Sequence, residues 1–147
     1  MNYFTTLIKP ASSTCMLRCK YCFYEDESSR RNIKNYGVMK EPVMTGMIDQ
    51  ILNYFKSETV ITFAFQGGEP TCAGIDWFQK FIDNVSLRKK KYHRIIYSIQ
   101  TNGILLNDKW AAFLKKNISL LEFQLMGRSR CMISSEFTLW EQELMTR

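Results

Sequence analysis

The chain has 147 residues, of which 46% are hydrophobic and 14% aromatic, and its formal net charge is +6. This apolar content excludes a disordered chain, and the length suits one domain or a piece of one. Complete α/β barrels typically need about 250 residues, so the chain is shorter than most of them.

Positive charge is densest in the run Arg-Lys-Lys-Lys at residues 88–91. The run falls at the end of an expected helix, where cations offset the negative end of the helix dipole. We therefore expect a solvated helix end and no nucleic-acid partner. The sequence shows neither a secretory signal nor an apolar stretch of membrane-spanning length, which predicts a cytoplasmic protein without a membrane partner.

The amino-terminal third contains one predicted strand and one predicted helix. The strand covers residues 5–9, and Pro10 ends it and opens a long loop. The helix covers residues 41–56, because apolar residues recur there at the spacing of one helix face. These positions are Met44, Met47, Ile48, Ile51, Leu52 and Phe55.

The same alternation continues along the chain. β-branched and aromatic residues predict a strand over residues 60–65, which stops at the turn Gln-Gly-Gly-Glu-Pro. A second helix is predicted over residues 75–88 and a further strand over residues 94–100, followed by the turn Thr-Asn-Gly. Asn107 or Asp108 is expected to cap a third helix.

Strands that alternate with helices favour an α/β fold with parallel strands. Each helix returns the chain to a parallel neighbour, so the loops that follow the strands gather at one edge of the sheet. The loop after residue 9, the Gly-Gly-Glu-Pro turn and the Thr-Asn-Gly turn are therefore expected to lie together.

Three cysteines lie within eight residues of that first loop: Cys15, Cys19 and Cys22. A closed structural zinc site and a regular four-iron cluster each use four protein ligands. Three thiolates suit a cluster in which one iron stays open to bind a cofactor or substrate. A zinc site completed by Cys72 or His93, and a group of structural cysteines, are the alternatives; neither Cys72 nor His93 is assigned a role.

The Cys-x3-Cys-x2-Cys spacing, with Tyr21 before the third cysteine, resembles the radical S-adenosylmethionine superfamily. Flanking segments resemble the anaerobic sulfatase-maturating enzymes within it; these are residues 7–13, 19–24, 63–71 and 100–103. The resemblance implies the amino-terminal portion of a partial (β/α) TIM-like barrel of the radical SAM type. It also implies a [4Fe-4S] cluster and S-adenosyl-L-methionine as cofactors.

The resemblance further implies roles for single residues. The cluster ligands would be Cys15, Cys19 and Cys22. The residues that help seat S-adenosylmethionine would be Tyr21, Gly67, Gly68, Glu69 and Asn102. Glycine lets backbone approach closely, and a glutamate offers a negative partner for an ammonium group. Tyr24 and Gln66 would lie near the substrate.

In that family the bound cofactor is cleaved to a 5′-deoxyadenosyl radical, and a cysteine or serine of a sulfatase is oxidised to formylglycine. The resemblance thus implies a sulfatase polypeptide as substrate and a reducing electron donor as partner. Another peptide-modifying radical enzyme and a non-enzymatic metal-binding module are the alternatives.

From residue 118 the sequence departs from the family pattern. Codons chosen for residues 118–127 and read from the third base can spell Phe-Ser-Ile-Gly-Ile-Ser-Ile-Asp-Gly, which resembles the next strand of the family. We therefore expect a truncated radical SAM domain over residues 1–117 and an out-of-frame tail over residues 118–147. Because half of the cofactor pocket would be missing, we expect weak or absent turnover. Within the domain, the polar segment 25–34 is expected to be a mobile excursion.

Overall fold

The computed structural model describes residues 1–20, 22–124 and 130–134. Its elements in chain order are β1 (Asn2–Ile8), α1 (Phe23–Ser29), α2 (Glu41–Tyr54), β2 (Thr59–Phe65), the 3-10 helix η1 (Pro70–Ala73), α3 (Ile75–Arg88), β3 (His93–Thr101), α4 (Asp108–Asn117), β4 (Leu120–Gln124) and β5 (Arg130–Ser134). The strands form one sheet in the order β1-β2-β3-β4-β5.

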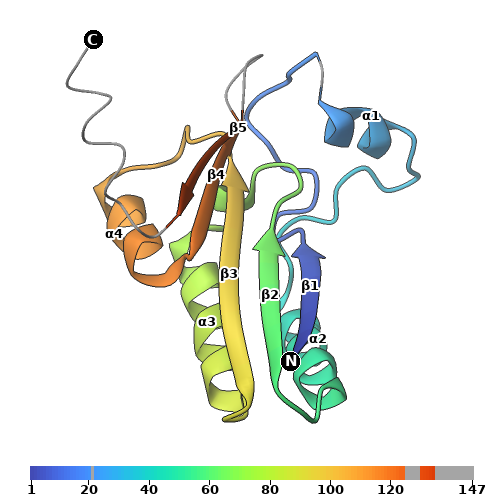
Figure 1. Cartoon of the computed structure of the whole chain (residues 1–147). Helices are drawn as coiled ribbons and strands as arrows, with labels where there is room; N and C mark the ends of the chain where they lie inside the picture. Colours follow the sequence, from blue (N-terminus) through green and yellow to red (C-terminus); the bar gives the residue numbers. More distant parts are fainter. Residues whose placement is uncertain (21, 125–129, 135–147) are drawn as a thin grey trace, which may run out of the picture.

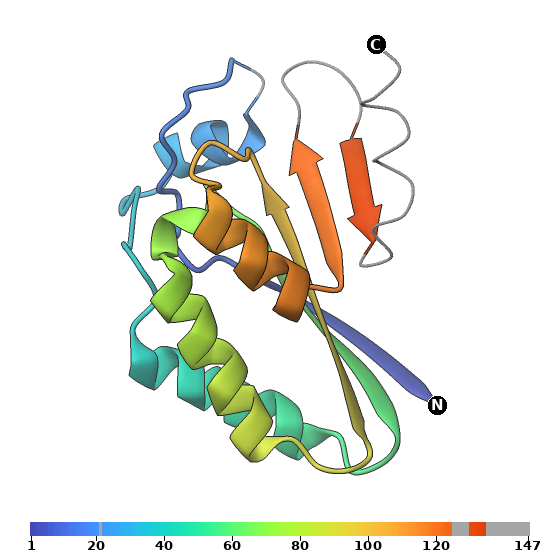
Figure 2. The same cartoon turned by 90° about the vertical axis from the view of Figure 1, so that its left-hand side faces the viewer.

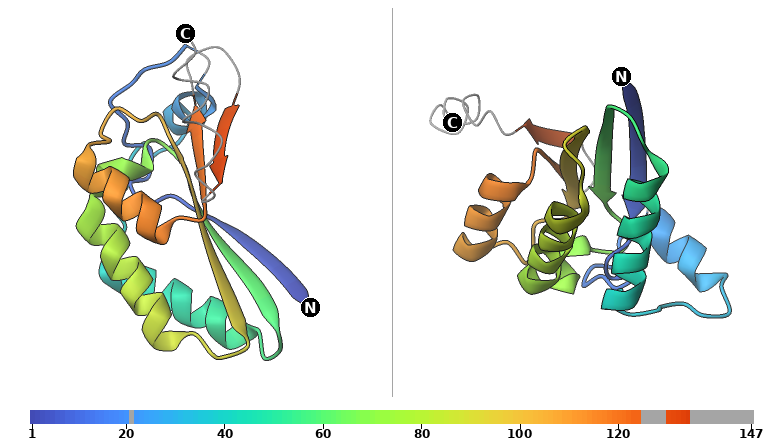
Figure 3. Two further views of the ribbon diagram at one scale, coloured as in Figure 1. Left: turned by 60° about the vertical axis from the view of Figure 1, so that its left-hand side comes forward. Right: turned by 90° about the horizontal axis from the view of Figure 1, so that it is seen from below.

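Strands β1 to β4 pair in parallel, and β5 adds antiparallel to β4. Helices α2, α3 and α4 cover the same face of this sheet (Figure 2, Figure 3). The arrowheads of the parallel strands point to one edge, beyond which α1 lies (Figure 1). This arrangement confirms the predicted α/β class and places the loops after β1, β2 and β3 at one edge.

The centre of the core lies between β2 and α3. Side chains alternate along a strand, and Phe63 and Phe65 of β2 face the helices. Their rings contact the ring of Phe81 at centroid distances of 5.2 and 5.1 Å. All three side chains are fully buried. Because burial of one phenylalanine contributes about 1.5–3 kcal/mol, this cluster fixes α3 on the sheet.

The helix boundaries agree closely with those predicted. α3 spans Ile75–Arg88, as expected. Asn107 is the N-cap of α4, and its side chain accepts a hydrogen bond from the Trp110 backbone N–H at 3.1 Å. Along the described part of the chain, none of the helices is long and apolar enough to cross a membrane.

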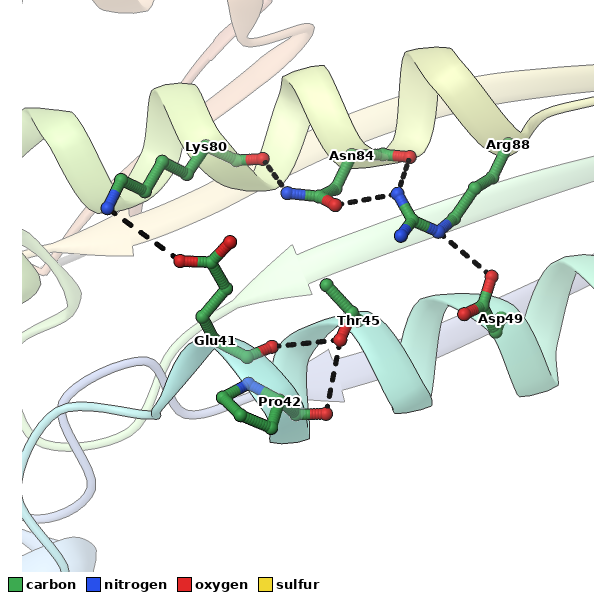
Figure 4. A network of polar contacts seen from close by, with 7 residues as sticks. All are labelled: Glu41, Pro42, Thr45, Asp49, Lys80, Asn84 and Arg88. Atoms are coloured by element: carbon green, nitrogen blue, oxygen red, sulfur yellow. Dashed lines mark hydrogen bonds and ion pairs between the residues drawn. The ribbon is translucent and has the colours of Figure 1, made fainter.

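A network of polar contacts joins α2 to α3 on the outer surface (Figure 4). Arg88 Nε lies 2.9 Å from Asp49 Oδ1, and Arg88 Nη1 donates to Asn84 Oδ1 at 2.6 Å. Lys80 and Glu41 form a longer ion pair of 3.8 Å. Arg88, the first residue of the basic run at residues 88–91, thus connects α3 to α2.

One strand boundary, one segment and one side chain differ from the prediction. Strand β1 spans Asn2–Ile8, whereas residues 5–9 were expected. Residues 25–29, expected to belong to a mobile excursion, are part of α1. The adjoining Tyr24 connects this helix to Gln66 at the end of β2, a long-range contact that polar composition does not reveal. His93 has partners that the sequence did not indicate: its Nδ1 accepts from the Lys90 N–H at 3.2 Å, so Nε2 carries the hydrogen that faces the Phe55 carbonyl at 3.0 Å.

Candidate functional site

The site begins where β2 ends. The Gly-Gly-Glu-Pro turn leaves the strand and lies against the loop that follows β1. The Gly68 N–H donates to the Ser12 carbonyl at 3.0 Å. The Glu69 N–H donates to the Thr14 carbonyl at 2.6 Å. These bonds hold the turn directly beside Cys15, the first of the three clustered cysteines.

Two glycines permit this close approach. Gly67 has φ of +119°, a backbone conformation that other residues rarely adopt. A β-carbon at Gly68 would lie 2.6 Å from the carbonyl carbon of Ser13 and 2.8 Å from its oxygen. Both glycines therefore serve the contact between turn and loop, while their predicted contact with a cofactor stays a prediction.

Glu69 is a buried carboxylate, with 1% of its surface exposed. Its Oε1 accepts from the Thr71 N–H at 3.0 Å, from the Thr71 hydroxyl at 2.5 Å and from the Thr101 hydroxyl at 2.7 Å. Its Oε2 accepts from the Asn102 N–H at 2.8 Å. A carboxylate has about four acceptor positions on its two oxygens, so Oε2 alone has capacity for a further donor. A contact between Glu69 and an ammonium group would therefore use Oε2, and that contact stays a prediction.

The three clustered cysteines are half-buried free thiols on one loop. The Cys15 sulfur accepts hydrogen bonds from the Leu17 N–H at 3.4 Å and from Asn102 Nδ2 at 3.6 Å. The Cys22 N–H donates to the Cys19 carbonyl at 3.0 Å, which closes a turn between the second and third cysteines.

The donor set of this loop bears on the predicted cluster. Within residues 1–20, 22–124 and 130–134, no three His, Cys, Asp or Glu side chains lie close enough together to hold a metal ion. The chemistry of the loop nevertheless fits, because thiolates are the usual ligands of iron–sulfur clusters and N–H donors to their sulfurs are a known feature of such sites. The ligand role of the three cysteines stays a prediction, and Tyr21 lies outside the described residues.

Tyr24 and Gln66, predicted to lie near the substrate, are in direct contact. The Tyr24 hydroxyl donates to Gln66 Oε1 at 2.6 Å. Burial and, secondarily, the charge of Cys22 raise the pKa of Tyr24, so its hydroxyl keeps its hydrogen at neutral pH. Lys9 Nζ lies 4.5 Å from the centroid of the Tyr24 ring, a cation–π contact. Burial, followed by the charge of Arg31, lowers the pKa of Lys9.

A pocket of about 280 Å³ lies beside the carboxyl ends of β2 and β3 and the first residues of β4. It is lined by Ala64, Phe65, Gln66, Ser98, Ile99, Gln100, Leu120 and Glu122. Ala64 and Gln66 alternate with Phe63 and Phe65, so their side chains point to the sheet face opposite the helices. Gln66 therefore both accepts the hydrogen bond from Tyr24 and lines the polar pocket on that face.

Cys72 lies in η1, directly after the turn, and is a half-buried free thiol. Burial raises the pKa of the Cys72 thiol, and the charges of Glu69 and Cys15 raise it further. The sequence indicated no role for three other residues of the site, although they lie in the segments that carry the resemblance: Lys9 and the two threonines that bind Glu69. A threonine beside a turn is too common to indicate such a role.

The sequence profile described as "Radical SAM superfamily" matches residues 10–127. The chain belongs to the radical SAM superfamily. The matched range contains the cysteine loop and both turns described above, which agrees with the resemblance that the cysteine spacing indicated.

This radical SAM protein is similar to curated relatives named anaerobic sulfatase-maturating enzymes. It is 45% identical over 127 residues to a cysteine-type enzyme of Clostridium novyi, a match that covers 86% of this chain and 33% of the relative. It is 30% identical over 126 residues to a serine-type enzyme of Bacteroides thetaiotaomicron, covering 82% of this chain and 29% of the relative. The chain thus spans about a third of the length of these relatives.

Solved structures give the same result for the fold of this radical SAM protein. A structure described as native anSMEcpe with bound AdoMet aligns with a TM-score of 0.68 at 44% identity, over 77% of this chain and 30% of the other. A second, with bound AdoMet and the Kp18Cys peptide, aligns with a TM-score of 0.67 at 41% identity, over 78% of this chain and 29% of the other. The fold is therefore part of the radical SAM fold, as the resemblance implied.

Proposed function

We propose that this chain carries the cluster-binding and S-adenosylmethionine-binding part of an enzyme that oxidises a sulfatase residue to formylglycine. The observation that supports the proposal is the contact between the three-cysteine loop and the Gly-Gly-Glu-Pro turn at the carboxyl edge of a parallel sheet. A bound [4Fe-4S] cluster would supply the electron that cleaves S-adenosylmethionine to a 5′-deoxyadenosyl radical.

The residues divide this work among them. The thiolates of Cys15, Cys19 and Cys22 would hold the cluster, and with three protein ligands for four irons one iron would be left for the cofactor. The residues that seat S-adenosylmethionine are Tyr21, Gly67, Gly68, Glu69 and Asn102. Tyr24 and Gln66 lie near the substrate, and the hydrogen bond between them fixes the Gln66 amide at the pocket. The target residue loses a hydrogen atom from its β-carbon and then a second electron and a proton.

The comparisons support one substrate class. Identity is 45% and 44% to cysteine-type relatives and 30% to a serine-type relative, which supports a cysteine target in a sulfatase polypeptide. Cleavage of the cofactor requires an electron from a reducing partner protein or small reductant, whereas the second electron released by the target requires an acceptor. We place the protein in the cytoplasm, where reducing conditions keep thiols free, as they are at all four cysteines whose side chains are described.

The proposed chemistry is tested by anaerobic reconstitution with iron and sulfide. We expect a four-iron cluster whose electron paramagnetic resonance spectrum changes when S-adenosylmethionine is added. One tightly bound zinc ion and no response to the cofactor would instead favour a non-enzymatic metal-binding module.

We further propose that residues 118–147 are encoded out of frame, following a truncated radical SAM domain at residues 1–117. Strand β4 still pairs with β3, and Ile118 is 6% exposed. An apolar segment read in another frame can form such contacts, because burial depends on hydrophobicity more than on sequence identity. Sequencing of the gene across codons 117 and 118 tests this proposal. We expect a reading frame, shifted by one step, that encodes a sequence similar to the family; if no such frame exists, the proposal is refuted.

A further inference from the structure

The carboxylate of Glu69 connects the ends of two neighbouring strands. Glu69 follows β2, and two of its four donors, the Thr101 hydroxyl and the Asn102 N–H, come from the end of β3. A buried carboxylate is costly unless its oxygens are satisfied, and here four donors satisfy them. Glu69 therefore acts inside the protein as a fixed connection between the two turns.

That connection determines where Asn102 lies. The Asn102 N–H is held by Glu69 Oε2 at 2.8 Å, and its side-chain Oδ1 accepts from the Ile104 N–H at 3.0 Å. Because Oδ1 already accepts a backbone N–H, the orientation of the amide is defined and Nδ2 is the atom that faces Cys15. The distance from Nδ2 to the Cys15 sulfur is 3.6 Å.

We propose that Glu69 is a positioning residue for Asn102, and that Asn102 holds an N–H donor on the Cys15 sulfur to raise the reduction potential of a cluster bound there. The proposal rests on the proposed function, because it takes Cys15 as a cluster ligand. Hydrogen bonds to the sulfurs are one of the factors that set cluster potentials. A donor stabilises the more negative, reduced state, so its loss makes the cluster harder to reduce.

The substitution Glu69→Gln separates this proposal from a simple charge effect. In Glu69→Gln, an NH2 group in the position of Oε1 would face three hydrogen-bond donors. The NH2 group is therefore expected in the position of Oε2, where it faces the Asn102 N–H. These two N–H groups are both donors, so they repel each other and Asn102 is displaced. Positioning predicts that the cluster becomes harder to reduce, whereas removal of a nearby negative charge alone would make it easier to reduce.

The experiment compares the wild-type chain with Glu69→Gln and Asn102→Asp, and uses Asn84→Asp on the outer surface of α3 as the control. Asn102→Asp keeps the Oδ1 acceptor for Ile104 and removes the donor to sulfur. After reconstitution, the reduced fraction of the cluster is measured at fixed potentials. We expect the ratio of reduced to oxidised cluster to fall several-fold in both site variants and to stay unchanged in Asn84→Asp. An unchanged or higher ratio in Glu69→Gln would overturn the inference.

A second measurement needs no cluster. In the metal-free chain, hydrogen exchange at the Asn102 N–H is expected to be slow in the wild type and at least ~10-fold faster in Glu69→Gln, while the amides of β2 keep their rates. Equal exchange at Asn102 would overturn the positioning role. If the wild-type chain takes up no iron, the proposed function and the stated effect on the reduction potential are both refuted. If the cluster forms but its potential is unchanged in both variants, only this inference is refuted.

Discussion

Gly68 lies directly against the backbone of Ser13, so that a β-carbon at residue 68 would be 2.8 Å from the Ser13 carbonyl oxygen. The neighbour is backbone and cannot rotate away. We expect Gly68→Ala to push the cysteine loop from the turn and to lower the free energy of unfolding by about 1–3 kcal/mol. Urea unfolding measures this change.

Gly46 provides the matched control for that substitution. It lies inside α2, and a β-carbon there would meet nothing within 4 Å. Gly46→Ala is expected to raise the free energy of unfolding by about 0.5–1 kcal/mol, because alanine favours a helix. Similar changes in the two variants would show that the crowding at Gly68 does not matter.

The hydrogen bond between Tyr24 and Gln66 is expected to hold α1 on the sheet edge. Tyr24→Phe removes the hydroxyl and keeps the ring beneath Lys9, so it tests the hydrogen bond without loss of the cation–π contact. We expect a loss of about 0.5–1.5 kcal/mol, concentrated in α1. Hydrogen exchange should rise in residues 23–29 and stay constant in α3; an even rise across both helices, or none, would contradict this role.

Tyr97 should make the fold sensitive to alkaline pH. Burial, and secondarily the charge of Asp83, raise the pKa of Tyr97 well above its ordinary value of 10.0. Above a pH of about 10 the unfolded chain therefore releases this proton before the folded chain does, and stability falls as the pH rises further. The free energy of unfolding between pH 9 and 11 should decline less steeply in Tyr97→Phe, and equally steep curves would count against this assignment.

The ion pairs between α2 and α3 differ in their expected contribution (Figure 4). Arg88 and Asp49 lie 2.9 Å apart with side chains 31% and 48% exposed, whereas Lys80 and Glu41 lie 3.8 Å apart and are 63% and 60% exposed. We expect Arg88→Met to cost about 0.5–1 kcal/mol and Lys80→Met to cost close to none. Thermal unfolding at low and high salt tests this, and an equal loss in both variants would disagree with the geometry.

The sequence predicted most of the fold because its signals are local. The apolar spacing from Met44 to Leu52 and the β-branched run ending at Phe65 each report one element and its buried face. The Asn107 cap was visible for the same reason. Helix α1 was not predicted, since the hydrogen bond of Tyr24 that connects it to the end of β2 joins residues far apart in the sequence.

The site could be predicted only in part. The cysteine spacing identified the loop, and the parallel topology placed it beside the two turns. The function of Glu69 inside the protein could not be foreseen, because its partners Thr101 and Asn102 are 32 and 33 residues away in sequence. Tertiary contacts of this kind leave no periodic pattern in the sequence.

The central claim is that Cys15, Cys19 and Cys22 hold a four-iron cluster. The measurement that tests it most directly is the iron and sulfide content of the anaerobically reconstituted chain and of its four single Cys→Ala variants at residues 15, 19, 22 and 72. We predict that the three loop variants lose the cluster and that Cys72→Ala retains it with its response to S-adenosylmethionine. A cluster that survives removal of a loop cysteine, or that requires Cys72, would contradict the account.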